Sequence, residues 1–142
     1  MRIREFSVQD GAQIAALAGQ LGYRIREDQA RTRLDRIGHD PVQALFVTES
    51  ESGAVIGWVH IHRTDRLLGD PVCEIGGIVV DEGHRGMGVG GLLLQRSEEW
   101  ARNAGCSTVK AGSNIERQRS PAFYRGAGYS LVMRQNVFVK EL

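Results

Sequence analysis

The amino-acid sequence predicts an α/β protein in which one mixed β-sheet carries helices on both faces. Segments with a period of two and segments with a helical period follow one another in the order β-α-α-β-β-β-α-β-α-β. Past the midpoint a strand, a helix and another strand form a crossover, which joins parallel strands, whereas tight turns elsewhere join antiparallel ones. A length of 142 residues, with 42% apolar and 25% charged residues, suits one globular domain over residues 1–142.

The first strand and the first helix are predicted from the N-terminal residues. Arg2–Phe6 alternates between polar and apolar residues, as a strand does. Ser7 followed by Asp10 resembles a capping box with Asp in place of Glu, and it begins a helix that Gly22 ends. Apolar residues at helical spacing form the inward stripe of this helix: Ile14, Leu17 and Leu21.

A second helix and a hairpin are predicted next. Glu27–Ile37 has the pattern of a charged helix whose inward residues are Ala30, Leu34 and Ile37. Gln43–Thr48 and Ala54–His62 have the pattern of two strands, and the turn-rich residues 49–53 between them predict a hairpin.

The second half of the chain is expected to complete the sheet. Its elements are, in order, a strand over Val72–Val80, a helix over Val89–Asn103 ended by Gly105, a strand over Ser107–Ala111, a short helix over Pro121–Gly126 and a last strand over Tyr129–Val139. The long helix has apolar residues at helical spacing: Val89, Leu92, Leu93, Trp100 and Ala104.

Composition and charge exclude several classes of protein. Lys and Arg number 18 and Asp and Glu 17, so a net charge of +1 provides no bulk attraction to nucleic acid or an anionic membrane. No apolar run approaches the ~20 residues of a membrane span, and no apolar signal region follows Met1. Cys73 and Cys106 make neither a CxxC pair nor a metal-ligand spacing, so a cytoplasmic protein without a metal site is expected.

The most informative segment joins the strand over Val72–Val80 to the helix over Val89–Asn103. Five glycines lie within nine residues: Gly83, Gly86, Gly88, Gly90 and Gly91. Glycine lets the backbone approach a ligand closely, and the first amides of a helix have no intrahelical acceptor and lie at the positive end of the helix dipole. Such a turn suits a phosphate group, and Arg85 adds a cation at its mouth.

Three other interpretations of this loop are weaker. A Walker-type loop is excluded, because no Lys-Ser or Lys-Thr pair follows the glycines. A dinucleotide fingerprint is formally matched by Gly86, Gly88 and Gly91, but the strand Ser107–Ala111 lacks the acidic residue that would bind the ribose. A turn without a ligand is disfavoured, because so many glycines cost folding entropy.

The loop resembles motif A of the GCN5-related N-acetyltransferase (GNAT) superfamily, (Arg/Gln)-x-x-Gly-x-(Gly/Ala), with Arg85, Gly88 and Gly90 in register. Glu82 stands where many members carry proline, which alters the turn but not the amides. Downstream, two further stretches are similar to the family's Ser-Asn and Phe-Tyr-x-x-x-Gly-(Phe/Tyr) pattern: Ser113-Asn114 and Phe123-Tyr124-Arg125-Gly126-Ala127-Gly128-Tyr129. The element order also matches, so the resemblance covers essentially the whole chain.

The resemblance implies a GNAT-like fold with acetyl-CoA as cosubstrate. The strands Val72–Val80 and Ser107–Ala111 would splay apart, with the pantetheine arm pairing with the backbone between them as an added strand does. The implied cofactor-binding residues are Ile78, Val79, Val80, Arg85, Gly86, Met87, Gly88, Val89, Gly90, Gly91 and Asn114. Asn114 would bond the pantetheine through its side-chain amide, or is a turn residue at the end of a strand.

Acyl transfer to an amine needs a base and an acid. An alkylamine with a pKa near ~10 is mostly protonated at pH 7 and must lose a proton before it attacks, and the thiolate leaving group can be protonated by an acid. Tyr124 matches the family's tyrosine that donates to the CoA sulfur, and its alternative role is that of a core aromatic beside Phe123.

The base is less certain in the sequence than the acid. A period of two places Glu74 on one strand face with Gly76, Ile78 and Val80, and some relatives carry a base on this strand. Glu74 is equally well explained as a salt-bridged residue. His60 and His62 share a face with Trp58 and could serve as a base, relay a proton, or be ordinary surface or edge histidines. His84 is expected to face solvent or phosphate.

The acceptor is expected to be a small molecule with a primary amine, while a peptide amine is an alternative. In the family the acceptor site is built from the first two helices and nearby loops, which here include Leu21–Tyr23 and the second helix over Glu27–Asp35. A CoA-binding domain without turnover is the alternative of another class. Many members form homodimers, and the apolar segment Asn136–Val139 offers an edge for one as well as an ordinary core pattern.

Overall fold

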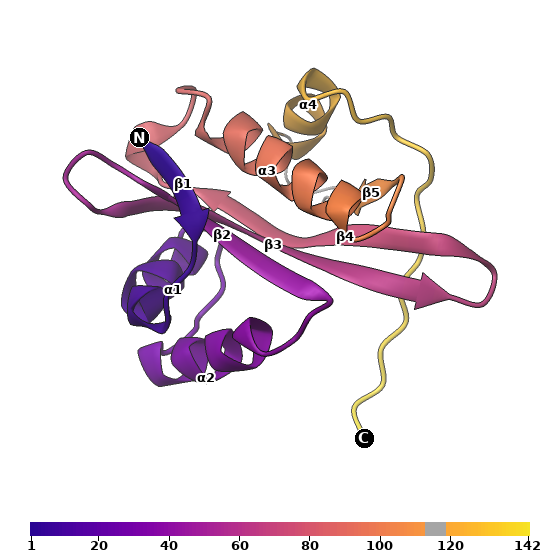
Figure 1. Ribbon diagram of the computed structural model, residues 1–142, viewed down its shortest axis with the longest axis horizontal. Coiled ribbons are helices and arrows are strands. Elements are labelled where there is room, and N and C mark those ends of the chain that lie inside the picture. The colour runs from indigo at the N-terminus through magenta and orange to yellow at the C-terminus, as the bar shows by residue number, and fades with distance from the viewer. Residues whose placement is uncertain (113–118) are drawn as a thin grey trace. The chain divides into compact units, whose positions relative to one another are not determined.

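The computed structural model describes residues 1–112 and 119–142, and it contains one five-stranded sheet (Figure 1). The elements are β1 (Arg2–Glu5), η1 (Val8–Asp10), α1 (Gly11–Gly19), α2 (Glu27–Gly38), β2 (Gln43–Glu49), β3 (Val55–Arg66), β4 (Gly69–Val80), η2 (Glu82–His84), α3 (Val89–Asn103), β5 (Val109–Ala111) and α4 (Arg119–Gly126). The strands lie in the order β1-β2-β3-β4-β5, and every neighbouring pair is antiparallel except the parallel pair β4/β5. The predicted mixed α/β sheet is therefore confirmed.

The chain divides into two compact units, Met1–Gly112 and Ser113–Leu142. The first holds the sheet with α1, α2 and α3, and the second holds α4. The strand predicted over Tyr129–Val139 is wrong, because residues 130–142 have no regular secondary structure. A strand is held by bonds to a neighbouring strand, and this segment pairs with none in the described part of the chain. Across residues 1–112 and 119–142, every helix is too short or too polar to cross a bilayer.

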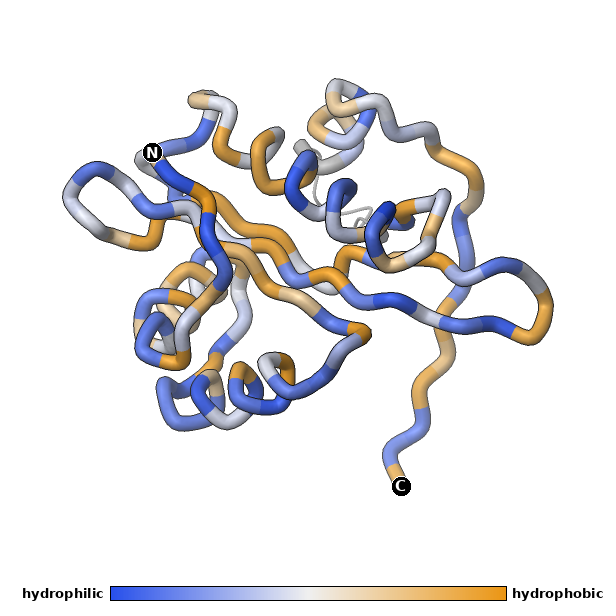
Figure 2. The backbone as a smooth tube through the Cα atoms, in the orientation of Figure 1, coloured by the Kyte–Doolittle hydropathy of each residue, from blue (hydrophilic) through white to orange (hydrophobic). Residues whose placement is uncertain are grey.

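Helices α1 and α2 cover one face of the sheet. Val47, Trp58 and Val79 lie directly opposite one another on three neighbouring strands, so their side chains share this face. They belong to a core that links these strands to both helices. Its buried members are Ile14, Leu17, Leu34, Leu45, Val47, Val55 and Val79, and Trp58 packs against them. Figure 2 shows this apolar band running along the central strands.

Helix α3 covers the opposite face, as Figure 1 shows. Gly57 on β3 marks the point of closest approach, because a Cβ there would lie 3.1 Å from Val89 Cγ1 and 3.2 Å from Leu93 Cδ1. On the same face, the Arg96 guanidinium lies 4.2 Å from the centre of the Phe46 ring. The two contacts anchor α3, and so the loop before it, on the sheet.

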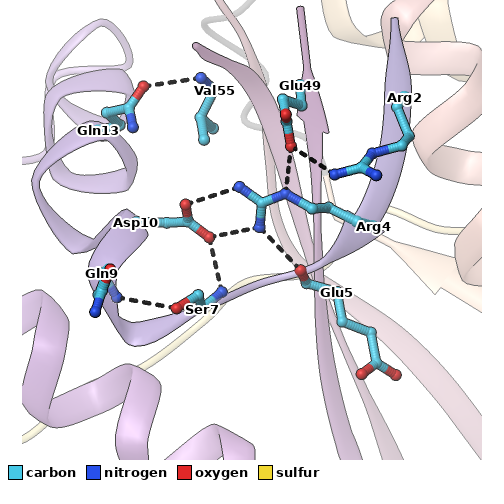
Figure 3. Close-up of polar contacts among 9 residues, drawn as sticks. All are labelled: Arg2, Arg4, Glu5, Ser7, Gln9, Asp10, Gln13, Glu49 and Val55. Carbon is cyan, nitrogen blue, oxygen red and sulfur yellow. Dashed lines mark hydrogen bonds and ion pairs between the residues drawn. The ribbon is translucent and has the colours of Figure 1, made fainter. Parts of the chain in front are cut away.

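An ion-pair network ties β1 to the start of α1 and to β2 (Figure 3). Arg4 donates from Nη1 and Nη2 to the two carboxylate oxygens of Asp10, both at 2.9 Å, and from Nε to Glu49 at 2.6 Å. Asp10 also accepts the Ser7 N–H at 2.7 Å, and Ser7 Oγ accepts the Gln9 N–H at 3.3 Å, so the predicted capping box is confirmed. The hydrogen bonds from Arg4 hold the pKa of Asp10 below its ordinary value.

Replacing Asp10 with asparagine is expected to lower the free energy of unfolding by about 2 kcal/mol at pH 7, because the part-buried Arg4 loses one of its two charged partners and keeps Glu49. A folded-state pKa below the unfolded value gives stability that is present above the unfolded pKa and is lost as the pH falls through the folded pKa. The gap between wild type and variant should therefore shrink below about pH 4. Urea unfolding at several pH values measures it, with the exposed Asp35→Asn as control, and a gap independent of pH would contradict this role of the pair.

Candidate active site

The glycine-rich loop places a row of backbone amides at the start of α3. The loop leaves β4 through η2, and α3 begins at Val89 as predicted. Gly86 and Gly88 have φ values of +76° and +85°, a conformation that favours glycine, and Gly88 is the N-cap. Leu92 makes the first intrahelical bond, to the Gly88 carbonyl at 3.1 Å. The amides between Gly88 and Leu92 therefore have no acceptor within the helix.

The glycines of this loop have open space where a side chain would lie. A Cβ at Gly86, Gly88 or Gly91 would meet no atom within 4 Å, so no packing inside the protein requires these glycines to lack a side chain. Val89 is 1% exposed and directs its side chain into the core, whereas Met87 is 61% exposed. The free amides at the positive end of the α3 dipole are suited to an anion.

Replacing Gly91 with alanine separates stability from ligand binding. Gly91 is helical and unhindered, so alanine should raise the free energy of unfolding of the unliganded protein by up to about 1 kcal/mol. The same methyl group would obstruct a phosphate and should weaken CoA affinity about ten-fold, or ~1.4 kcal/mol. Calorimetric titration with CoA measures the second effect, and Gly38→Ala at the end of α2 is the control. Equal CoA affinity in all three proteins would contradict a role of these amides in binding the phosphate groups of CoA.

The loop is fixed by a polar cluster that sequence reasoning missed. Gln20, just after α1, donates from Nε2 to Asp81 Oδ1 at 2.8 Å and accepts the Glu82 N–H on Oε1 at 2.9 Å. Asp81 Oδ2 accepts from Gly83 N–H at 3.2 Å and from His84 Nδ1 at 2.7 Å. The side-chain bonds from Gln20 and His84 lower the pKa of Asp81. His84, expected to face solvent or phosphate, thus binds a carboxylate of its own loop.

The backbone of β4 next to the loop faces an open edge. The Asp81 N–H donates to the Ile56 carbonyl at 2.8 Å, and hydrogen-bonded pairs recur at every second residue, so Val79 also directs its backbone groups to β3. Ile78 and Val80 direct theirs to the opposite side. The Val80 carbonyl there accepts Arg85 Nε–H at 3.2 Å, so Arg85 braces the loop against the strand.

Strand β5 pairs with only part of β4. The parallel register joins Cys73 to Val109 and ends with Ile75 opposite Ala111. Strand β4 continues to Val80 with no further partner on this edge among the described residues. The ladder therefore ends before Ile78–Val80, the part of β4 where the resemblance implies pantetheine binding.

The face assigned to Glu74 requires a correction. Ile75 lies opposite Ile61 and Gly77 opposite His60, so Gly76 is the extra residue of a β-bulge. The bulge shifts the alternation by one residue. The prediction that Glu74 shares a face with Ile78 and Val80 is therefore wrong.

Glu74 instead shares the α1/α2 face of the sheet. It lies opposite His62 on β3 and beside Lys110 on β5, and it is half-buried. His60 occupies the same face, with its ring 5.8 Å from that of His62. Among the residues that the structure describes, no group of three His, Cys, Asp or Glu side chains is arranged to hold a metal ion.

A cavity of about 510 Å³ lies at the connection between α1 and α2. Its lining residues are Ala15, Ala16, Gly19, Tyr23, Arg24, Ile25, Arg26 and Gln29. Gln20 immediately follows this part of α1, so the cavity adjoins the element that holds the glycine-rich loop.

Two predicted site residues fall in the second unit. Tyr124 lies on α4, with its ring 5.2 Å from that of Phe123 and 5.7 Å from that of Tyr129. The helix ends where the Tyr129 N–H bonds the Tyr124 carbonyl at 2.9 Å. Asn114 lies outside the described residues.

Comparison with known proteins identifies the family. A sequence profile of the acetyltransferase (GNAT) family matches residues 12–129. The chain is 29% identical over 131 residues, 89% of this chain and 84% of the other, to aminoglycoside N(6')-acetyltransferase type 1 of Stenotrophomonas maltophilia. It is 34% identical over 79 residues, 55% of this chain and 51% of the other, to aminoalkylphosphonate N-acetyltransferase of Salmonella typhimurium.

A solved structure supports the same assignment at the level of the fold. Aminoglycoside N-acetyltransferase AAC(6')-Iy in complex with CoA superimposes with a TM-score of 0.89 at 21% identity, over 99% of this chain and 95% of that one. The family match over residues 12–129 covers most of the chain. The chain belongs to the GNAT acetyltransferase family and is an acetyl-CoA-dependent N-acetyltransferase.

Proposed function

We propose that this enzyme moves the acetyl group of acetyl-CoA to the primary amine of a small molecule by direct attack. The amide row between Gly86 and Gly91, beside the unpaired edge of β4, is the observation that carries the donor half of the proposal. The cavity of about 510 Å³ at the α1–α2 connection supports a small acceptor, since pockets for small molecules occupy roughly 300–1,000 Å³. The related enzymes act on aminoglycosides and aminoalkylphosphonates by name, which also supports a small amine.

The donor would bind along two surfaces. The pyrophosphate would accept hydrogen bonds from the amides of Gly86–Gly91, with Arg85 at the mouth. The pantetheine arm would lie along Ile78–Val80, where two residues present backbone groups to the open edge, and the Asn114 amide would bond it further. We propose that both compact units form one domain, because the match to the family extends through both.

Two side chains carry the chemistry in this proposal. The acceptor arrives as an ammonium ion with three N–H bonds and leaves as an amide with one, so it loses two protons. Glu74 takes the first, which turns the ammonium into a nucleophilic amine. Tyr124 protonates the departing CoA thiolate and regains its proton afterwards, so the net products are the amide, CoA–SH and one proton released to solvent.

Thiol release from acetyl-CoA tests the proposal. The purified protein is mixed with a panel of aminoalkyl acids, amino sugars, an aminoglycoside and a peptide with a free N-terminus, and free CoA–SH is measured against a sample without amine. Faster release with at least one small amine is expected. CoA binding without release across the panel would favour a binding domain, and release with the peptide alone would contradict the small acceptor.

A second copy of the chain is a further proposed partner. Val137, Phe138 and Val139 are 73%, 91% and 85% exposed, and a partner chain would remove this apolar surface from water. Light scattering on a size-exclusion column should give twice the mass of one chain. A single-chain mass at micromolar concentration would contradict the dimer.

A further inference from the structure

His60 lies at the point where β4 loses its pairing with β5. It faces the β-bulge at Gly76, and a Cβ on that glycine would lie 2.9 Å from His60 Nδ1. Gly76 is exposed and directly follows Ile75, the last residue of β4 that pairs with β5. His60 Nδ1 therefore lies beside Gly76, one residue past the last β4/β5 pair, in space that a side chain on that glycine would fill.

A chain of hydrogen bonds fixes which nitrogen of His60 carries the proton. Asp40 Oδ2 can only accept, so the Gln43 amide nitrogen at 2.7 Å must donate to it. The Gln43 carbonyl oxygen is thereby turned to His60 Nε2, at 2.8 Å, and accepts its N–H. A neutral His60 thus holds its lone pair on Nδ1, the atom at the bulge.

The surroundings of His60 favour the neutral ring. Burial lowers its pKa, and the neighbouring His62 adds to the effect when it is charged. The other titratable groups near the ring are Glu74, opposite His62 on β4, and Asp40, which reaches it only through Gln43. At pH 7 Nδ1 is therefore available to accept a proton.

We infer that His60 is a catalytic base, whose Nδ1 takes the second proton from the acceptor nitrogen as the C–N bond forms. This inference rests on the proposed function. Attack by the neutral amine on the thioester carbonyl makes the C–N bond and leaves the nitrogen positively charged with two protons. One moves to Nδ1, the C–S bond breaks, and the thiolate takes a proton from Tyr124. His60 then returns its proton to solvent, so its charge is unchanged over one turnover.

The test uses two substitutions of His60. His60→Gln should lower kcat for thiol release about 10²-fold with little change in KM for acetyl-CoA. In wild type the rate should fall on the acid side, at a pH lower than the ordinary imidazole pKa of ~6.5, as the ring takes up a proton, and the variant should lose this limb. His60→Ala leaves a hole beside Gly76, and added imidazole should restore part of its rate.

Gln43, which positions the His60 ring, supplies a second and milder variant. Gln43→Leu leaves the imidazole in place but removes the bond that fixes its tautomer, so kcat should fall less than in His60→Gln and KM should change little. His39→Gln, at the exposed end of α2, is the control and should keep the wild-type rate.

The outcomes distinguish the role of His60 from the proposed function on which it rests. A wild-type protein that releases no thiol with any amine overturns both. An active wild type with a His60→Gln variant of equal kcat overturns the role of His60 alone. The role of His60 is also overturned if its variants have a low kcat but His60→Gln keeps the acid limb and imidazole does not restore the rate of His60→Ala. That result would show a structural role.

Discussion

Replacing Tyr124 with phenylalanine is expected to lower kcat for thiol release about 10²-fold, the usual contribution of one positioned acid, while CoA affinity stays nearly constant. The variant keeps the ring and its contacts with Phe123 and Tyr129, so α4 should remain intact. The substitution removes the hydroxyl group, which in the proposal protonates the sulfur. The kcat value under saturating acetyl-CoA and acceptor, together with a calorimetric Kd for CoA, measures the two effects separately.

Tyr129→Phe is the matched control for this experiment. Tyr129 belongs to the same aromatic cluster and lies just beyond the end of α4, so its substitution perturbs the same packing. We expect its kcat to stay close to the wild-type value. Equal losses in both variants would assign Tyr124 a packing role, and a full rate in Tyr124→Phe would remove it from the chemistry.

The parts of the fold that sequence predicted are those decided locally. Helix α3 begins at Val89 and ends at Asn103 as expected, because its glycine-rich start, apolar spacing and Gly105 stop all lie within one short segment. The capping box at Ser7 was predictable for the same reason. The phosphate-type loop needed no long-range information either, since strand, glycines and helix are contiguous.

The parts that sequence missed depend on partners far along the chain. The bulge at Gly76 exists because β4 has one more residue than β3 between two ladder pairs. From the sequence, Gly76 and Gly77 would be equally acceptable places for it. Gln20 binds Asp81 and Glu82, 61 and 62 residues away, and its surrounding sequence gives no sign of this. The expected strand at Tyr129–Val139 had the right alternation but no partner edge.

The bulge changes what the sequence could say about the site. Strict alternation would direct Glu74 to the same side as Ile78, away from the histidines of β3. The extra residue moves Glu74 to their side, opposite His62, and brings Gly76 under His60. A carboxylate and an imidazole therefore share the α1/α2 face, next to the end of the β4/β5 pairing. Two groups able to accept protons match the two protons that an ammonium acceptor must lose.

Replacing Glu74 with glutamine is expected to reduce kcat/KM for an alkylamine acceptor about 10²–10³-fold at pH 7. For an amine with a pKa near 10, only about one molecule in 10³ is neutral at that pH, and the carboxylate normally draws on the protonated majority. As the pH rises toward 10, the acceptor loses its proton without help, so the deficit should shrink. Asp70→Asn, an exposed carboxylate at the start of the same strand, should match wild type throughout.

The acceptor itself provides the sharper comparison. An amine with a pKa near 8 is already about one-tenth neutral at pH 7, so the Glu74→Gln deficit should fall to about ten-fold with it. A deficit that is the same for both amines and at every pH would mean that Glu74 does not deprotonate the ammonium. The His60→Gln deficit should behave differently, because the proton that His60 takes exists only after the C–N bond has begun to form. Its size should depend little on the acceptor pKa, and this contrast separates the two roles within one set of measurements.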